Sequence, residues 1–338
     1  MAKYATLKDV AEKAGTTPST VSYVLSNKSG RYISKKTREK VMKAVRELDY
    51  IKSIGAASLK GKEVKLVGIL VPQFENQFFT RIIVASEKIL MKAGYDLIIC
   101  DTLDNPIRER DFIRRMIEQR VDGLVVTPSP EGGSNTARVR RIGIPMVVVD
   151  RQLAGVNEDY YLVATDNYKC SELAAANLLS HGHKKAAFIG WDTGISDLLE
   201  RRRAAQDVYR SKGELFIEED DLSDEGGKRA VMRVMEQHPD VTAFLFGFNL
   251  QAKGGIKYLT NAGKIIGKDI SVVLIGSPEW VTAGNNNFTH VHMGDEEVGA
   301  RAAELLLKLI KRDECLPCEK KLVQACSLVE GASVADIT

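Results

Sequence analysis

The sequence predicts a small all-α head followed by a larger α/β body, whose two lobes are each built on a doubly wound parallel sheet. Three observations lead to this fold class. Two short helical segments meet at a glycine near the start of the chain. From residue 63 onward, short apolar runs alternate with longer amphipathic segments, as they do in parallel α/β folds. The alternation restarts after residue 164, so the body divides into two units of similar size.

The head begins with two helices joined by a tight turn at Gly15. Thr6 and Asp9 have the spacing of a capping box for the first helix, on which apolar residues recur at helical intervals. Thr17 is the expected N-cap of the second helix, and Pro18 stands at its first position, where the missing N–H costs nothing. This pattern predicts a helix-turn-helix, whose second helix lies in a DNA major groove. The side chains expected to point outward are Ser19, Thr20, Ser22 and Tyr23.

A third helix is expected over residues 34–48, where it closes the small core of the head. The segment that follows is short, mixed in composition and interrupted by glycine, which is typical of a linker. We therefore predict a helix-turn-helix domain at residues 1–50, a hinge at 51–62 and a two-lobed domain at 63–338. The expected N-lobe combines residues 63–164 with 294–322, and the expected C-lobe combines residues 165–293 with 323–338.

The charge distribution separates the head from the body. Residues 1–62 contain fourteen Lys or Arg and five Asp or Glu, a net charge of +9. The remaining residues contain 34 and 40, a net charge of −6. A basic head of this size is the electrostatic footprint expected for a polyanionic partner. Solvated lysine-rich helices are the alternative, but they account less well for the asymmetry between the two parts.

The elements of the body follow from its apolar runs and its helical periodicity. In the first unit we expect strands at 66–71, 95–100, 123–126 and 145–149, and helices at 79–92, 107–119 and 135–142. In the second unit we expect strands at 185–190, 242–247 and 271–275, and helices at 168–180, 195–211, 225–237 and 250–262. A long helix at 296–312 and a final strand at 321–329 complete the chain, and Gly132 and Gly133 are expected in a flexible loop. Ligands of such sheets bind beyond the carboxyl ends of the strands, so the cleft between the lobes is the expected pocket.

Residue types that carry catalysis or bind metals form no complete set. The cysteines, at positions 100, 170, 315, 318 and 326, are scattered, which argues against a disulfide framework. Cys315 and Cys318 have the spacing of a metal or redox motif, but a zinc site needs two further ligands, and two free thiols in a surface loop are the alternative. His290 and His292 would share one face of a strand, and a single pair makes no metal site. No catalytic triad order, phosphate-binding loop or dinucleotide fingerprint occurs, so we expect neither an enzyme nor a cofactor.

Two further features bear on location. No apolar run approaches the roughly 20 residues that span a bilayer. The sequence starts without the apolar core of a signal peptide. We therefore expect no membrane association and a cytoplasmic location, with the nucleoid when DNA is bound.

The chain resembles the LacI/GalR family of transcriptional regulators over essentially its whole length. The resemblance rests on motifs at residues 6–15, 19–22, 37–41, 48–50 and 121–124, on Asp150 with Arg151, and on Gly182 with His183. It implies a periplasmic-binding-protein-like body and a homodimer that binds a pseudo-palindromic operator, with one head per half-site. It also implies a regulator, most often a repressor, that a small molecule in the cleft controls allosterically.

The resemblance implies a set of DNA contacts. The positions that match base-reading residues are Pro18, Ser19 and Tyr23, and those that match phosphate or flanking contacts are Thr17, Thr20, Ser22 and Asn27. Arg31 is expected to add a base or phosphate contact, and Thr6 is a further expected DNA-contact residue. In the family, a hinge leucine wedges into the minor groove, and Leu59 matches it, with Lys60 at a neighbouring minor-groove position. Many family members have Arg where this chain has Tyr23, so its operator should depart from the common sequence. Partial packing of Tyr23 onto the third helix is the alternative.

The resemblance also implies an effector site, from which this chain departs. The positions that match are Asn76, Phe78, Phe79, Asp150, Arg151 and Arg201. On the distal wall, Phe248, Asn249, Gly276, Ser277 and Met293 replace more polar residues. The expected effector is therefore sugar-like, or atypical and less polar, and Trp280 is either a stacking partner for it or a surface aromatic. The alternatives are that Phe78 and Phe79 are simple core aromatics, that Asp150 and Arg151 form an ion pair of structural value only, and that the pocket is vestigial in a regulator controlled by a protein partner. A solute-binding protein and an enzyme are the rival classes.

Overall fold

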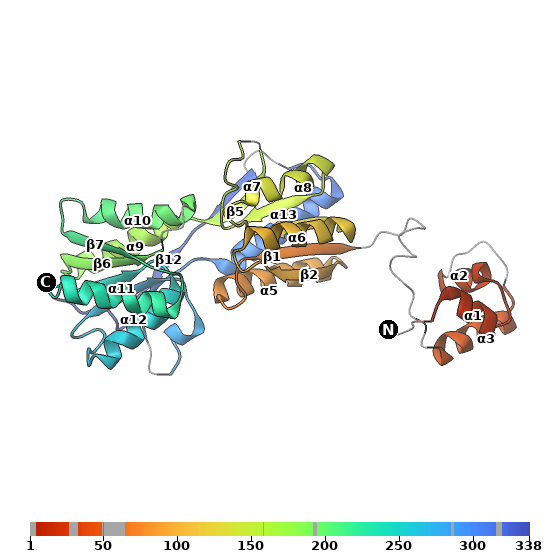
Figure 1. The fold of residues 1–338 in the computed structure, drawn as a ribbon, viewed down its shortest axis with the longest axis horizontal. Coiled ribbons are helices and arrows are strands. Elements are labelled where there is room, and N and C mark those ends of the chain that lie inside the picture. Colours follow the sequence, from red (N-terminus) through yellow and green to blue (C-terminus); the bar gives the residue numbers. More distant parts are fainter. Residues whose placement is uncertain are drawn as a thin grey trace. The chain divides into compact units, whose positions relative to one another are not determined.

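The computed structural model of the chain describes residues 5–26, 33–48, 50, 65–157, 159–191, 195–284, 287–315 and 320–338. It divides into two compact units, Met1–Val64 and Lys65–Thr338. We call the first unit the head and the second unit the body (Figure 1). Among the described residues, no helix combines the length and the apolar character that crossing a lipid bilayer requires.

In its described residues the head has three helices, α1 (Leu7–Lys13), α2 (Pro18–Ser26) and α3 (Lys35–Glu47). The predicted capping box is confirmed, because the Thr6 N–H donates to Asp9 Oδ2 at 2.7 Å and the Asp9 N–H donates to Thr6 Oγ1 at 3.3 Å. Gly15 has a φ of +62°, which lets the chain turn sharply between α1 and α2. The buried side chains of the head core are those of Val10, Ala11, Ala14, Val21, Val24, Val41 and Ala44.

The N-lobe of the body is a six-stranded sheet in the order β11-β5-β4-β3-β1-β2, in which every neighbouring pair is parallel. Its strands are β1 (Leu66–Val71), β2 (Asp96–Asp101), β3 (Gly123–Val126), β4 (Met146–Val149), β5 (Tyr161–Thr165) and β11 (Lys321–Gln324). Its helices are α5 (Gln77–Lys92), α6 (Pro106–Glu118), α7 (Gly132–Asn135), α8 (Ala137–Ile142) and α13 (Asp295–Lys311). Side chains of α5 and α13 share one core cluster with the sheet, and those of α6 and α8 share another.

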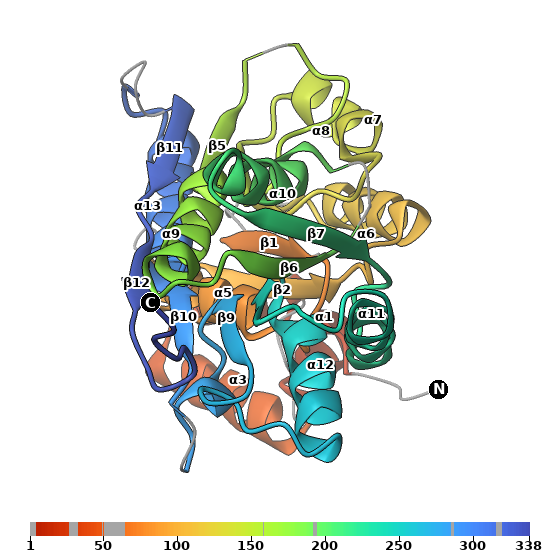
Figure 2. The ribbon, with the colours of Figure 1, turned by 90° about the vertical axis from the view of Figure 1, so that its left-hand side faces the viewer.

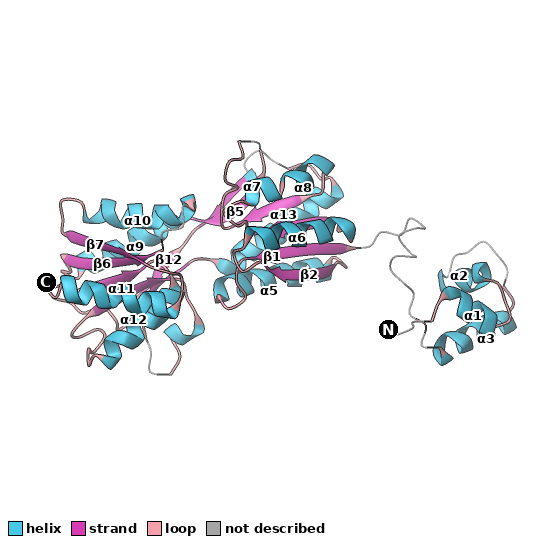
Figure 3. Ribbon diagram, in the orientation of Figure 1, coloured by secondary structure: helices cyan, strands magenta, loops and turns pink. Residues whose placement is uncertain are grey.

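The C-lobe is a second six-stranded sheet in the order β12-β10-β9-β8-β6-β7, parallel except for the β10–β12 pair. Its strands are β6 (Lys185–Gly190), β7 (Glu214–Glu219), β8 (Ala243–Phe246), β9 (Ser271–Ile275), β10 (Thr289–His292) and β12 (Ser327–Val329). Its helices are α9 (Asn167–Ser180), α10 (Ser196–Tyr209), α11 (Asp224–Gln237), α12 (Asn249–Asn261) and the short 3-10 helix η1 (Glu279–Val281). Helices α9 and α10 cover one face of this sheet, and α11 and α12 cover the other (Figure 2). Sheet layers between helical layers are visible in both lobes (Figure 3).

The chain passes between the lobes three times, from β5 to α9, from β10 to α13 and from β11 to β12. The prediction of a single final strand at 321–329 is therefore wrong. β11 extends the N-lobe sheet beside β5, whereas β12 pairs antiparallel with β10 in the C-lobe. The break lies at Ala325 and Cys326, where neither glycine nor proline marks it in the sequence.

The prediction of a flexible loop at Gly132 and Gly133 is also wrong. Both glycines are buried and form the start of the short helix α7. A side chain at Gly133 would overlap the carbonyl oxygen of Ala154, and one at Gly132 would overlap Pro128. These glycines permit close packing of the chain against the neighbouring loop.

Candidate functional site

The head presents an exposed face on α2. Thr17, Pro18, Ser19 and Tyr23 are exposed, whereas Val21 and Val24 are buried on the opposite side. Thr17 caps the helix as predicted, because its Oγ1 accepts from the Thr20 N–H at 3.2 Å and lies 3.0 Å from Thr20 Oγ1. Tyr23 is 39% exposed, so packing onto α3 does not bury it. The face is thus available to a partner, and the DNA roles of its residues stay a prediction.

Ion pairing fixes the helices behind this face. Lys13 of α1 lies 3.1 Å from Glu47 at the end of α3, and Lys43 lies 3.8 Å from the same carboxylate. The hydrogen bond and charge of Lys13 hold the pKa of Glu47 below its usual value. Of the predicted DNA-contact residues, Asn27, Arg31, Leu59 and Lys60 lie outside the described residues, as does Cys318.

A small cavity that opens to solvent lies between the two lobes of the body. The side chains that line it are Gln73, Asn76, Phe78, Phe79, Asp150, Arg151, Trp191, Arg201, Leu222, Phe248, Asn249, Ile275 and Met293, together with Gly276. Every predicted effector residue is among them except Ser277, which lines a smaller adjoining cavity beside Asn249 and Met293. Most lining residues follow the carboxyl ends of strands in both sheets, which is where such sheets bind ligands.

The N-lobe wall of the cavity combines an aromatic pair with polar groups. Asn76 caps α5 through its Oδ1, which accepts from the Phe78 N–H at 3.2 Å. The rings of Phe78 and Phe79 meet edge to face, with centroids 5.2 Å apart. Asp150 follows β4 with a φ of +68° and is 5% exposed. This wall therefore offers hydrogen-bonding groups next to an apolar surface.

Arg151 makes its main ion pair with a residue that the sequence did not indicate. Its Nη1 lies 2.7 Å from Asp104 Oδ1, whereas its Nε lies 3.8 Å from Asp150 Oδ2. The Pro128 carbonyl accepts from the same Nη1 at 3.3 Å. The expected alternative, a structural pair of Asp150 with Arg151, is thus the weaker of two contacts.

A fully buried carboxylate fixes the loop behind Arg151. Glu109 of α6 accepts from the Ser129 N–H and from Asn135 Nδ2, the latter at 2.7 Å. Burial raises the pKa of Glu109, and these hydrogen bonds oppose the rise. The loop after β3, which supplies the Pro128 carbonyl, is thereby anchored to α6.

The C-lobe wall is dominated by apolar side chains. Phe248 and Ile195 form a small core cluster with Trp191 and Leu222, and the rings of Trp191 and Phe248 meet edge to face at 6.2 Å. Arg201 lies beneath this cluster, with its guanidinium carbon 4.9 Å from the centroid of the Phe248 ring. Trp191 was not predicted, although it directly follows the predicted strand 185–190, and Gln73, Leu222 and Ile275 were missed as well.

Arg201 is only 5% exposed and is held by neutral acceptors. Its Nε donates to Asn167 Oδ1 at 2.7 Å, and its Nη1 donates to the Gly247 carbonyl at 2.6 Å. Its Nη2 lies 3.7 Å from the sulfur of Met293. Buried guanidinium groups need such partners, because desolvation penalises an unpaired charge.

Trp280 does not belong to the cavity. Its ring packs edge to face on Phe288, with centroids 5.9 Å apart, beside the core of the C-lobe. A stacking role toward a ligand in the cleft is therefore not supported by its position. The structure instead supplies Trp191 as the tryptophan of the cleft.

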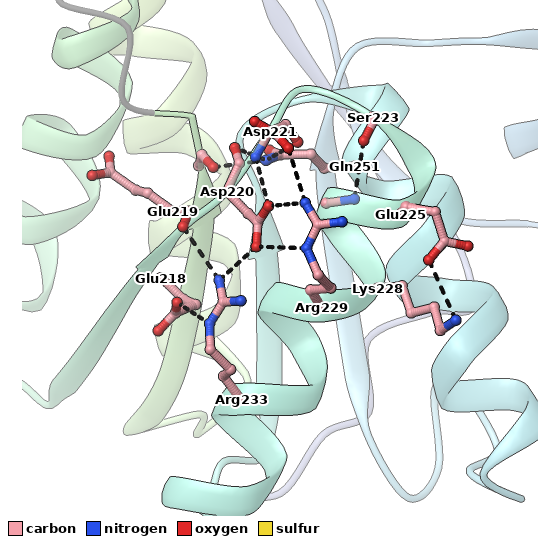
Figure 4. A network of polar contacts seen from close by, with 12 residues as sticks. Glu218, Glu219, Asp220, Asp221, Ser223, Glu225, Lys228, Arg229, Arg233 and Gln251 are labelled. Atoms are coloured by element: carbon pink, nitrogen blue, oxygen red, sulfur yellow. Dashed lines mark hydrogen bonds and ion pairs between the residues drawn. The ribbon is translucent and has the colours of Figure 1, made fainter.

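A polar network surrounds Asp220 and Asp221 (Figure 4), the two residues before Leu222, which lines the cavity. Gln251 Nε2 donates to the carbonyls of Gly190, Asp220 and Asp221, at 2.7, 3.0 and 3.2 Å. Arg229 and Arg233 of α11 both bind the Asp220 carboxylate. Burial opposes ionisation of Asp220, but the hydrogen bonds outweigh it and lower the pKa to about 2. The loop between β7 and α11 is thus fixed from both sides.

Hydrogen bonds between described residues join the lobes across the cleft. Asn249 Nδ2 donates to Asn76 Oδ1 at 3.2 Å, and the Glu279 N–H donates to Gln77 Oε1 at 2.6 Å. Both acceptors stand at the start of α5. Any rotation of one lobe against the other must lengthen or break these bonds.

Metal binding has no support in the parts of the chain that the structure describes. There, no group of three or more His, Cys, Asp or Glu residues lies close enough to hold an ion. The imidazole of His290 hydrogen-bonds the Phe288 carbonyl through Nδ1 at 2.8 Å. Cys315 lies in the loop after α13, with its Sγ 3.8 Å from the Asp313 carbonyl.

Comparisons with known proteins match both parts of the chain. Residues 6–53 match the family described as "Bacterial regulatory proteins, lacI family", and residues 67–281 match "Periplasmic binding protein domain". The HTH-type transcriptional repressor PurR of Klebsiella pneumoniae is 31% identical over 340 residues, with 98% of each chain covered. The lac repressor dimer bound to operator has a TM-score of 0.80 at 22% identity, covering 98% of this chain and 100% of its own. A regulator from Enterococcus faecalis V583 with bound ribose has a TM-score of 0.71 at 26% identity, covering 81% of this chain and all of its own.

Proposed function

Because this chain belongs to the lacI family of bacterial regulatory proteins, we propose that it is a transcriptional repressor whose operator affinity is set by a small molecule bound between the lobes. The observation that carries the proposal is a capped, outward-facing α2 on a basic head, together with a lined cavity at the strand ends of the body. The relatives are repressors, and the chain is accordingly a DNA-binding regulator and not an enzyme. A regulator of this kind acts on the chromosome, so we place it in the cytoplasm.

We assign base reading to α2. Ser19 and Tyr23 carry donor and acceptor groups on its exposed face, and Pro18 offers an apolar contact such as a thymine methyl accepts. Thr17, Thr20 and Ser22 are the phosphate contacts that we assign to the same helix. Two heads on a pseudo-palindromic operator require a homodimer. Apolar side chains exposed on the N-lobe support a partner surface, since Val84 and Met91 of α5 are 48% and 51% exposed.

The effector that fits the cavity is less polar than a simple sugar. Among the described lining side chains of the C-lobe, only Arg201, Asn249 and the indole N–H of Trp191 offer polar groups, and Arg201 and Asn249 already make hydrogen bonds. A hydroxyl group buried there without a partner would cost about 1–3 kcal/mol. We therefore assign to the effector a polar edge, directed toward Asp150 and Arg151, and an apolar face directed toward Trp191 and Phe248.

Control of DNA binding then follows from lobe orientation. A ligand that touches both walls binds the two lobe arrangements with different affinities, and only this difference shifts the equilibrium between them. In a dimer, the lobe arrangement sets whether the two heads fit one operator. The N-lobe supplies the connection to the head, since β1 of the N-lobe is the first strand after the predicted hinge.

The DNA half of the proposal is tested by selecting binding sites from a random duplex pool with the full-length chain. We expect a pseudo-palindrome, and Ser19→Ala and Tyr23→Ala should each relax selection at one base position by about 1–3 kcal/mol. Leu59→Ala should weaken binding to the selected site far more than binding to unrelated DNA. Equal losses on both DNAs, or a pool without enrichment, would contradict these assignments.

The effector half is tested by thermal unfolding of the full-length chain against sugars, sugar phosphates, aryl glycosides, nucleosides and amino acids. A ligand at about a hundredfold its dissociation constant stabilises by roughly 2.7 kcal/mol. Phe248→Asn makes the C-lobe wall more polar and should shift preference toward hydroxyl-rich compounds. A wild-type preference for the most hydroxylated compounds, unchanged in this variant, would overturn the assignment of an apolar face.

A further inference from the structure

The three crossover segments between the lobes meet in one hydrogen-bonded node. The Asp166 N–H donates to the Gln324 carbonyl at 3.2 Å, which joins the first crossover to the third. Thr165 Oγ1 donates to the Met293 carbonyl at 2.9 Å, which joins the first crossover to the second. Relative movement of the lobes must therefore alter the hydrogen bonds between these crossover segments.

Two cysteines lie at this node. Cys170 is in the first turn of α9 and is fully buried, whereas Cys326 lies between β11 and β12 and is partly exposed. Both converge on one carbonyl, because Asp166 O accepts from the Cys170 N–H at 2.9 Å and lies 3.9 Å from Cys326 Sγ. Cys326 also packs against the core cluster to which Cys170 belongs. They come from crossovers that are about 160 residues apart in sequence, and the fold alone brings them together.

We propose that Cys170 and Cys326 form an oxidation site, in which hydrogen peroxide converts the two thiols to a disulfide that ties the first crossover to the third. Cys326 attacks peroxide through its sulfur, which breaks the O–O bond and yields a sulfenic acid and one water. The Cys170 sulfur then displaces the sulfenic hydroxyl, which leaves as a second water when it takes up the Cys170 proton. The thiols lose two electrons and two protons, and one peroxide is reduced to two waters.

The surroundings assign different roles to the two sulfurs. The hydrogen bond from Cys170 lowers the pKa of Cys326, whereas that bond and burial raise the pKa of Cys170. The thiolate is the nucleophile, and oxidant reaches a partly exposed sulfur more readily than a buried one. Cys326 is therefore the sulfur that reacts with peroxide, and Cys170 is the resolving thiol.

The disulfide would lie one helical turn from a residue that holds a side chain of the cavity. Asn167 begins α9 one turn before Cys170, and its Oδ1 holds Arg201 of the cavity. A covalent link between α9 and the third crossover restrains the segments that must move when the lobes rotate. Oxidation would thus fix one lobe arrangement whatever the ligand in the cleft, which makes it a second input to the same regulator.

The experiment treats the reduced full-length chain with hydrogen peroxide, quenches it with catalase and an alkylating reagent, and maps disulfides by mass spectrometry of unreduced peptides. We expect a Cys170–Cys326 cross-link, loss of two of the five thiols and recovery with dithiothreitol. Cys326→Ser should abolish the cross-link, and Cys170→Ala should leave Cys326 as a trapped sulfenic acid. A variant with serine at positions 315 and 318 is the matched control and should still form it. A disulfide between other cysteines, or over-oxidation of Cys326 without a cross-link, would overturn the assignment.

A second readout tests the lock itself. Hydrogen exchange at residues 165–167 and 324–327 should slow on oxidation of the wild type and should not change in Cys326→Ser. Unchanged exchange in a protein that does carry the disulfide would refute the restraint on the lobes. Neither readout uses DNA or an effector, so their outcomes are separate from those that test the proposed repressor.

Discussion

Removing the two hydrogen bonds across the cleft should open the lobes by a calculable amount. Asn249→Ala removes the donor to Asn76, and Gln77→Leu removes the acceptor for the Glu279 N–H. A hydrogen bond contributes a net of about 0.5–1.5 kcal/mol, so the double variant weakens the joined arrangement by about 1–3 kcal/mol. This free energy lowers the ratio of joined to separated lobes by about 5- to 150-fold.

The substitutions are chosen so that they leave each lobe intact. Asn76 keeps its cap on the Phe78 N–H in the variant, because that bond does not involve Asn249. Gln77 is the first residue of α5, and its main chain is unaffected by a change of side chain. Asn261→Ala and Gln119→Leu repeat the same chemistry at exposed helix ends away from the cleft and serve as the matched control.

Small-angle X-ray scattering of residues 65–338, which form a compact unit, measures the effect. The radius of gyration should rise in the double variant and stay at the wild-type value in the control. Amide exchange in the three crossovers should quicken in parallel. If scattering and exchange in the double variant match the wild type, these bonds do not hold the lobes together, and the reasoning fails.

Three further perturbations have defined outcomes. Gly254→Ala places a methyl group onto the Asp224 carbonyl where α11 and α12 cross. It should lower the free energy of unfolding, measured in urea, by about 1–3 kcal/mol or more. Lys257→Ala, at an exposed position of the same helix, is the control and should change it by less than about 0.5 kcal/mol. Burial lowers the pKa of His183 and His290 below the ordinary 6.5, so the folded state binds fewer protons than the unfolded state. The free energy of unfolding should therefore be at its full value above pH 6.5 and should fall as the pH is lowered. A urea midpoint that is equal at pH 7.5 and pH 5 would contradict this. Ser34→Ala removes the cap of α3 at the Thr37 N–H and should cost the head about 0.5–2 kcal/mol by calorimetry, with most of it restored by Ser34→Thr.

Four strands were predicted to the residue, β4 and β8 to within one residue at an end, and β5 and β7 were missed. The bounds of β1, β3, β6 and β9 match the prediction because nearly every residue in them is apolar. β7 was missed because Glu214–Glu219 is a half-exposed edge strand that ends in acidic residues. Glutamates at these positions are typical of an exposed segment, but in the structure Glu218 and Glu219 pair with arginines of neighbouring helices.

Cavity residues that directly follow predicted strands could be predicted. Those held in place by residues distant in the sequence could not. The family resemblance indicated residues such as Asp150 and Phe248, and both follow predicted strands, in agreement with the rule for ligand sites in such sheets. Leu222 reaches the cavity only because Gln251, about 30 residues later, binds the carbonyls before it. Asp104 pairs with Arg151 across 47 residues. Contacts between residues so far apart in the sequence leave no periodic pattern from which they could be predicted.

Arg201 connects the cavity to the crossovers in a single step. Its Nε binds Asn167, which begins α9 after the first crossover, and its Nη2 contacts Met293 in the second crossover. Met293 in turn receives the hydrogen bond of Thr165, so the two crossovers share partners with the same guanidinium. A ligand that draws the guanidinium toward the cavity must alter these contacts, because a buried donor cannot serve two acceptors at full strength. A short route from the cavity to the lobe orientation therefore exists, since a residue that lines the cavity also holds the segments that connect the lobes.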